Sequence, residues 1–138
     1  MFDLTDKRAL VTGASGGIGG AIAKGLHAQG AIVALSGTRV DALQALADEL
    51  GGRTHVIACD LSSSEGAQQL IKDCDEAMGG IDILVNNAGL TRDNLAMRMK
   101  DEDWQTVLDV NLTASFLLSK ACLRGMMKQR FGRIIGIT

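Results

Sequence analysis

The sequence predicts an α/β fold with a doubly wound parallel sheet, and two observations predict it. Short apolar runs alternate with amphipathic helical patterns along the chain, an order that leads to right-handed crossovers and parallel strands. A cluster of glycines separates the first apolar run from the first helical pattern, as in the phosphate-binding turn of a Rossmann-type fold. The length suits one domain, residues 1–138.

The first part of the chain alternates strand, helix and strand. We expect the first strand over residues 7–11 and the second over residues 31–35, whose fully apolar character favours a central strand buried on both faces. The helix between them is expected to end at Gly30 and to present one buried apolar row, formed by Ile18, Ile22 and Leu26.

Two further helices flank the third strand, which is expected over residues 54–59. Each helix begins at a capping-box pattern, Thr38 with Asp41 in one and Ser62 with Glu65 in the other. Paired glycines end both helices. The residues expected to face the core are Val40, Leu43, Leu46 and Leu50 in the first helix, and Leu70, Ile71, Cys74 and Met78 in the second.

The last part of the chain contains a fourth strand, a polar loop, a long helix and a fifth strand. We expect the strand over residues 81–85, the loop over 91–100 and the helix from 101 to about 129. Such a helix is about 40 Å long and usually has a second packing partner beyond its own sheet. The fifth strand is expected over residues 133–138, an apolar run with no turn after it, which suggests a sequence cut within a domain.

The glycine-rich turn reads Thr12-Gly13, then three residues, then Gly17-Ile18-Gly19. In this interpretation Gly13 makes the turn, Gly17 lets a diphosphate approach, and Gly19 lets the helix pack against the strand. A glycine cluster alone can also be an ordinary loop. Its position between a strand and a helix favours phosphate binding, because the free N–H groups and dipole of a helix N-terminus attract anions.

Composition argues against several classes of function. The net charge is −2 with no basic run, so we expect neither a nucleic acid partner nor a membrane-surface partner. No apolar stretch suggests a signal peptide or a bilayer span. Three cysteines, Cys59, Cys74 and Cys122, lack metal-ligand spacing and are interpreted as small apolar core residues in a reducing compartment. We expect no metal site, and structural roles for His27 and His55.

Four features, in order and spacing, resemble the N-terminal motifs of the classical short-chain dehydrogenases/reductases. They are the turn Thr12–Gly19, Asp60, the run Asn86–Gly89, and Asn111. Residues 89–104, 125–130 and 132–135 narrow the resemblance to bacterial 3-oxoacyl-[acyl-carrier-protein] reductases. The resemblance covers essentially all of the chain but only about the first half of such an enzyme. It implies that strands one to five are present and that the C-terminal strands and helices are missing.

The resemblance also implies site residues. Asn111 belongs to the family's active site, where it holds a water that connects to a catalytic lysine. It could also be a structural amide on the inward face of the long helix, and the two roles are compatible. Asp60 and the run Asn87–Gly89 could also be plain turn residues. The residues implied to bind the cofactor are Gly13, Ala14, Ser15, Gly16, Gly17, Ile18, Gly19, Thr38, Arg39, Asp60, Leu61, Asn87, Ala88 and Gly89.

The end of the second strand favours NADPH over NADH. An NAD site needs a carboxylate there to accept from the ribose 2′-hydroxyl, but residues 36–39 contain none. Thr38 and Arg39 are therefore interpreted as contacts of the 2′-phosphate, which a guanidinium can bind with two hydrogen bonds. Many relatives place a further arginine where this chain has Gly16, so Arg39 becomes the main basic contact. Alternatively, Arg39 is a solvated residue at a helix start.

The family's remaining catalytic groups are a serine, a tyrosine and a lysine, and this sequence has no tyrosine. The chain as it stands cannot run the family's mechanism. We therefore expect the cofactor-binding part of a cytoplasmic, homo-oligomeric (dimeric or tetrameric) reductase that acts on acyl carrier protein carrying a 3-oxoacyl group. The alternatives are a catalytically incomplete nucleotide-binding or oligomerising fragment, or another short-chain dehydrogenase.

Carrier-protein docking is expected at a basic cluster near the end of the long helix. Its members could instead only complement the helix dipole. The cluster consists of Arg124, Lys128, Arg130 and Arg133.

Overall fold

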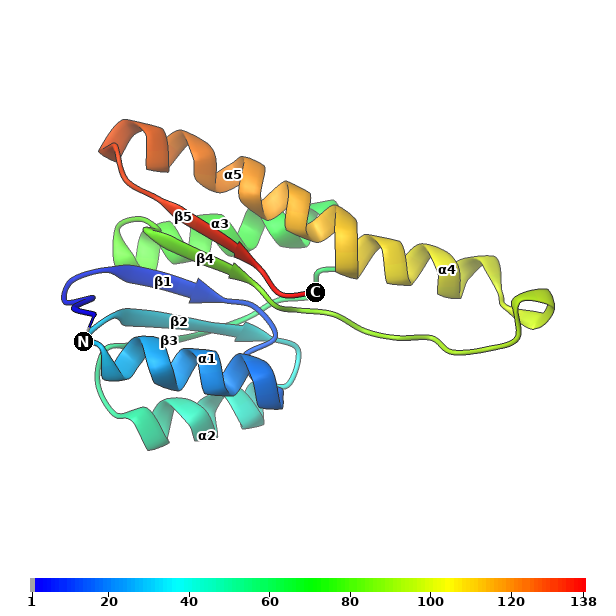
Figure 1. Ribbon diagram of the computed structural model, residues 1–138, viewed down its shortest axis with the longest axis horizontal. Coiled ribbons are helices and arrows are strands. Elements are labelled where there is room, and N and C mark those ends of the chain that lie inside the picture. Colours follow the sequence, from blue (N-terminus) through cyan, green and yellow to red (C-terminus); the bar gives the residue numbers. More distant parts are fainter. Residues whose placement is uncertain (1) are drawn as a thin grey trace.

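A computed structural model describes residues 2–138 and shows one five-stranded parallel sheet (Figure 1). The strand order is β3-β2-β1-β4-β5, so the chain moves outward from β1 in one direction and then in the other. This is the doubly wound α/β arrangement that the sequence predicts. The strands are β1 (Arg8–Val11), β2 (Ile32–Gly37), β3 (Thr54–Ala58), β4 (Ile83–Asn86) and β5 (Arg133–Gly136).

Helices cover both faces of the sheet, which creates two separate apolar cores. Helices α1 (Gly17–Ala28) and α2 (Val40–Leu50) lie on one face, and α3 (Ser64–Met78) and α5 (Ala114–Gln129) lie on the other (Figure 1). Alternate residues of a strand point to opposite faces, so Leu10 enters one core and Val11 the other. Residues 9–11 are therefore completely buried, which explains their uninterrupted apolar sequence.

The buried face of α1 agrees only in part with the sequence prediction: Ile22 and Leu26 are partly buried and pack against the core, but Ile18 does not. The residues that α1 buries fully are Gly19 and Ala23, whereas Ile18 is 64% exposed. The reason is the close approach of α1 to the turn before it: a Cβ at Gly19 would collide with the carbonyl oxygen of Gly13. This contact turns Ile18 away from the sheet. Val40 is also largely exposed, because α2 packs through Leu43, Leu46 and Ala47 instead.

Both predicted capping boxes are wrong. The residue before α2 is Arg39, and no side chain caps that helix. Helix α3 is capped by Ser63, whose hydroxyl oxygen accepts a hydrogen bond from the N–H of Gly66 at 3.2 Å. Three consecutive serines, residues 62–64, lie at the start of α3, and the hydroxyl that meets the free N–H groups of the first turn belongs to the second of them.

The long helix begins and ends where the sequence predicts, but it contains three parts. Helix α4 (Asp101–Leu108) continues through a π-helical turn, η2 (Asp109–Thr113), into α5. A short 3₁₀ helix, η1 (Ala96–Arg98), lies in the loop before it. Figure 1 shows residues 89–108 projecting from the rest of the molecule, and we call this segment the arm.

The combined helix Asp101–Gln129 is long and apolar enough to span a membrane, by length and composition alone. This contradicts the expectation that the chain has no such segment. In the fold, one row of α5 accounts for part of the apolar content: Ala114, Leu118, Cys122 and Met126 are buried in the core shared with α3 and β4. Large apolar side chains also lie outside this row.

A network of hydrogen bonds joins the start of β1 and the residue before β4 to the end of α5. The Arg8 guanidinium donates to both carboxylate oxygens of Asp82, from Nε at 2.9 Å and from Nη2 at 3.0 Å. The side chain of Gln129 joins this pair, since its Oε1 accepts from Arg8 and its Nε2 donates to Asp82. Burial raises the pKa of the Asp82 carboxyl, but the hydrogen bonds from Arg8 outweigh it and hold the pKa below its ordinary value.

Replacing Asp82 is expected to destabilise the fold. Asp82→Asn leaves the largely buried Arg8 guanidinium without its charge partner, so the free energy of unfolding should fall by about 2 kcal/mol. Because the folded-state pKa is depressed, this contribution is present above the unfolded-state pKa and is lost as pH falls through the folded-state pKa. Urea titrations at pH 7 and pH 3 should therefore differ less in the variant than in the parent, and Glu76→Gln, an exposed site on α3, should change neither value.

The outer edge of β5 should make the chain prone to aggregate. Residues 133–138 are exposed, and Ile134, Ile135 and Ile137 are each about two-fifths accessible beside unpaired backbone groups. We expect concentration-dependent assembly and broad thermal unfolding, and Ile135→Lys should lower the aggregated fraction in sedimentation velocity several-fold. A parent chain that is monomeric and melts cooperatively would contradict this expectation.

Candidate functional site

A cavity of about 500 Å³ opens at the carboxyl ends of the strands, beside the point where the strand order reverses between β1 and β4. This is the position where doubly wound sheets bind ligands. Segments from the whole chain converge there. The lining residues are Gly13, Ser15, Gly16, Gly17, Ile18, Gly19, Ser36, Gly37, Thr38, Arg39, Cys59, Asp60, Leu61, Asn87, Ala88, Gly89, Leu90 and Val110.

The glycine-rich turn forms one wall of the cavity and packs tightly against the residues after β4. Gly13 has a positive φ of 63°, and a Cβ there would lie 2.9 Å from the Cα of Ala88. The side-chain amide of Asn87 donates to the carbonyl oxygens of Thr12 and Gly13, at 3.1 and 3.2 Å. By contrast, nothing lies within 4 Å of a Cβ built at Gly17. The turn therefore leaves open space where the sequence predicts a diphosphate.

Thr12 joins the turn to β4 and is the residue whose role the sequence interpretation missed. Its side chain is buried, and its hydroxyl lies 3.3 Å from the carbonyl oxygen of Val85, to which it donates. The Thr12 hydroxyl oxygen in turn accepts from the backbone N–H groups of Asn87 and Ala88, at 3.0 and 2.9 Å. A hydroxyl at the end of an otherwise apolar strand was the available signal.

The opposite wall is formed by the residues that follow β2 and β3. Arg39 Nη2 donates to the carbonyl oxygen of Ser15 at 3.1 Å, so its guanidinium reaches from the start of α2 to the glycine-rich turn. The carboxylate of Asp60 accepts from the N–H of Ser62 at 2.9 Å, and this hydrogen bond holds the pKa of Asp60 below its ordinary value. Asp60 is thus both a turn residue and part of the cavity wall.

Asn111 is exposed, so the expectation that it faces inward is wrong. It lies in the π-helical turn, and its side-chain amide binds both backbone groups of Leu90. Nδ2 donates to the Leu90 carbonyl oxygen and Oδ1 accepts from the Leu90 N–H, each at 2.9 Å. The structure therefore shows Asn111 as a structural amide that fixes the base of the arm beside the cavity.

Most of the predicted cofactor-binding residues line the cavity, and Ala14 does not. Ala14 is buried, and its N–H donates to the carbonyl oxygen of Ser36 at 3.0 Å, which joins the turn to β2. The sequence interpretation missed several lining residues because they carry no charge or motif: Ser36, Gly37, Cys59, Leu90 and Val110.

The cysteines and histidines show no ligand geometry in residues 2–138, where no three His, Cys, Asp or Glu side chains gather as they do around a metal ion. Cys74 and Cys122 are buried free thiols, as predicted, and burial raises the pKa of each to about 12. Cys59 is only half-buried, and its thiol donates to the carbonyl oxygen of Gly66 at 3.2 Å. His27 Nε2 lies 2.7 Å from the carbonyl oxygen of Gly52.

Comparisons with known proteins agree with this geometry. Residues 7–138 match the family model described as short chain dehydrogenase. The chain is 56% identical over its full length to nodulation protein G of Rhizobium sp. (strain N33), and 50% identical over 99% of its length to the 3-oxoacyl-[acyl-carrier-protein] reductase FabG of Vibrio cholerae. It spans 56% of the length of each of these curated relatives.

A solved structure shows the same fold. The chain superposes with a TM-score of 0.92 and 38% identity on a metagenomic short-chain oxidoreductase crystallised in complex with NADP, with 97% of this chain and 62% of that protein covered. The family model accounts for nearly all of the chain, and the strand order, the cavity and the glycine-rich turn agree with it. This chain therefore belongs to the short-chain dehydrogenase family.

Proposed function

We propose that this chain is the cofactor-binding part of an NADPH-dependent 3-oxoacyl-[acyl-carrier-protein] reductase of fatty acid biosynthesis. The observation that carries the proposal is the cavity at the strand ends, where the glycine-rich turn, Arg39 and the residues after β4 converge. The reductase of Vibrio cholerae, at 50% identity, supports the substrate class. A cytoplasmic location is also part of the proposal.

The cavity fits an NADP cofactor chemically. The turn leaves open space at Gly17 beside the N-terminus of α1, whose backbone N–H groups suit a diphosphate. Thr38 and Arg39 line the cavity at the end of β2, where residues 36–39 offer no carboxylate to repel a 2′-phosphate. The small residues Ala88 and Gly89 leave room for the ribose and nicotinamide end. When bound, the cofactor supplies a hydride.

In this proposal the chain's own residues bind and orient the cofactor, but they include no proton donor of the expected type. Residues 1–138 include no tyrosine. In the proposed reaction the ketone oxygen must receive a proton as the hydride arrives, and a positioned phenol is the family's donor. That donor must therefore come from outside these residues. The Asn111–Leu90 contact has a different role in the proposed site, since it holds the base of the arm beside the cavity.

Two partners belong to the proposal: an acyl carrier protein bearing a 3-oxoacyl group, and further copies of this chain in a dimer or tetramer. Lys128, Arg130 and Arg133 lie together at the end of α5 and the start of β5, and positive charge there suits an acidic carrier protein. The second candidate function is another short-chain dehydrogenase, and the observation that favours it is the 56% identity to nodulation protein G.

Arg39 should determine the preference for NADPH. Arg39→Ala removes the charged contact proposed for the 2′-phosphate, so the dissociation constant for NADPH should rise roughly ten- to hundredfold while that for NADH stays unchanged. Gly37→Asp should favour NADH, and the added Cβ fits, because Ser15 Oγ would lie 3.4 Å away. Lys72→Ala, on the exposed face of α3, is the control in fluorescence titrations. Equal NADPH affinity in the parent and Arg39→Ala would contradict this role.

Binding and turnover should separate in this chain. We expect NADPH fluorescence to change on binding, but no oxidation of NADPH when a 3-oxoacyl carrier protein is added. A longer protein that adds a tyrosine with a lysine four residues later should do both. Turnover by residues 1–138 alone would contradict the assignment of the proton donor, and lack of NADPH binding would contradict the cofactor assignment.

A further inference from the structure

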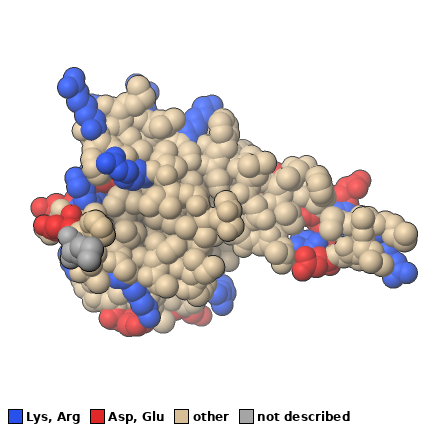
Figure 2. Space-filling model, in the orientation of Figure 1, with Lys and Arg blue, Asp and Glu red and all other residues tan. Residues whose placement is uncertain are grey.

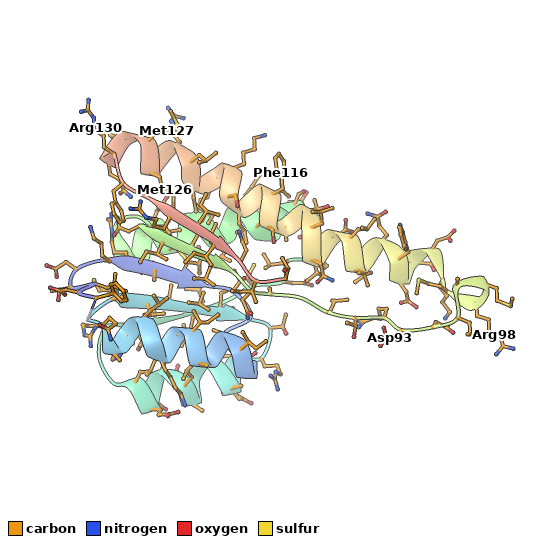
Figure 3. All side chains as sticks on the ribbon, viewed as in Figure 1. Asp93, Arg98, Phe116, Met126, Met127 and Arg130 are labelled. Carbon is orange, nitrogen blue, oxygen red and sulfur yellow. The ribbon has the colours of Figure 1, made fainter. Side chains whose placement is uncertain are left out.

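A second cavity, of about 490 Å³, lies between α3 and α5, and we call it the α3–α5 cavity. It shares no lining residue with the cavity at the carboxyl ends of the strands. Residues 79–81, which lead into β4, form part of its wall, so it opens at the amino ends of the strands. Figure 3 shows Met126 and Arg130 at this end of α5, away from Arg98 on the arm.

The floor of the α3–α5 cavity is apolar. Ile71, Ile81 and Cys122 line it, and all three are buried members of the core between the sheet and these two helices. An apolar group that enters the cavity therefore rests on core side chains and leaves water. Burial of this kind supplies most of the favourable free energy in small-molecule sites.

Gly125 lines the cavity from within α5, yet no contact inside the described residues 2–138 requires a glycine there. Nothing lies within 4 Å of a Cβ built at Gly125, whereas a Cβ at Gly19 in α1 would collide with the turn before it. Glycine is the least favourable helix residue apart from proline, because its backbone loses the most freedom on folding. What the missing side chain provides at Gly125 is open space in the cavity.

Two exposed side chains of opposite charge also line the cavity: Asp75 from α3 and Lys128 from α5. The ion pairs within residues 2–138 join other side chains, so these two charges remain available. Burial raises the pKa of the Cys122 thiol, and the negative charge of Asp75 raises this pKa further. The Asp75 carboxylate therefore lies close to the cavity floor.

The surroundings favour a different charge on each side of the cavity. Asp75 lies in the last turn of α3, where the partial negative charge of a helix C-terminus adds to that of the carboxylate and favours a bound cation. Figure 2 shows Lys and Arg side chains around the end of α5, where Lys128 lies, and these favour a bound anion. A ligand with one group of each charge matches both sides.

We propose that the α3–α5 cavity binds a small zwitterion with an apolar side chain, an α-amino acid of the size of leucine. Its ammonium group lies beside Asp75 and its carboxylate beside Lys128. Its side chain lies on the apolar floor, in the space that Gly125 leaves. Because the two cavities share no residue, this ligand and NADPH bind at the same time.

A ligand series tests the two charges and the floor. We expect free leucine to bind the 138-residue chain with a dissociation constant of about 1 mM, as suits a ligand of so few atoms. Three analogues each lack one group: 3-methylbutylamine the carboxylate, 4-methylpentanoate the ammonium group, and free glycine the side chain. Each should bind roughly tenfold more weakly in NMR titrations of the ¹⁵N-labelled chain. Equal affinity for leucine and any analogue, or no binding of leucine below about 10 mM, overturns the proposal.

Filling the cavity tests its position. In Gly125→Leu the new side chain occupies the proposed space, so leucine binding should be lost. The helix gains a more favourable residue, so the urea midpoint should not fall. Gly25→Leu is the matched control, since Gly25 is an exposed helical glycine of α1 with nothing within 4 Å of a built Cβ. Binding that survives Gly125→Leu, or that is lost equally in Gly25→Leu, overturns the proposal.

Neutralising each charge tests its assigned partner. Lys128→Met should remove the advantage of leucine over 3-methylbutylamine, and Asp75→Asn should remove its advantage over 4-methylpentanoate. Lys120→Met and Glu76→Gln make the same charge changes at exposed sites of α5 and α3 that do not line the cavity, and they should have no effect. Unchanged selectivity in Lys128→Met and Asp75→Asn overturns the proposal. Since Lys128 also belongs to the basic cluster proposed for the carrier protein, these titrations contain no carrier protein.

The outcomes separate this site from the proposed function. Saturating NADPH should change the dissociation constant for leucine by less than about twofold, because the two cavities are separate. Competition between NADPH and leucine would place leucine in the other cavity and overturn the proposal. If the chain binds leucine with the expected selectivity but does not bind NADPH, the cofactor assignment fails and the amino acid site stands.

Discussion

The hydrogen bonds around Thr12 are the constraint on which the rest of the site depends. One hydroxyl contacts the carbonyl oxygen of Val85 and the N–H groups of Asn87 and Ala88, and the Asn87 amide returns two bonds to the glycine-rich turn. These bonds fix the two segments that diverge at the strand-order reversal. The cavity lies between these two segments. Its shape therefore depends on the hydrogen bonds of Thr12 and Asn87, which hold both segments in place.

Much of the fold could be predicted from the sequence because its signals are local. Fully buried strands are continuous apolar runs, and the glycine-rich turn has one position between β1 and α1. Ile18 could not be placed, because its orientation depends on how closely Gly19 approaches Gly13 in space. The capping serine of α3 could not be chosen among three neighbours for the same reason: hydroxyl geometry, not residue type, decides.

The sequence predicts those lining residues whose type suggests their chemistry. It misses those that line the cavity only because of where the fold places them. Arg39 and Asp60 were found as charged groups after strands, and both line the cavity. Val110 and Leu90 also line it, and no sequence pattern marks them. Asn111 was found by its motif, yet its contact with Leu90 joins residues 21 positions apart and depends on the π-helical turn.

The π-helical turn also divides the long helix into two segments of different phase. A π turn closes its hydrogen bonds one residue later than an α turn, so it accommodates about one extra residue. One residue corresponds to about 100° of rotation around an α-helix. The apolar rows of α4 and α5 therefore cannot be read as one continuous periodicity. An insertion or deletion within Asp109–Thr113 would rotate the arm about the helix axis relative to the sheet, so the length of this turn sets the direction in which the arm faces.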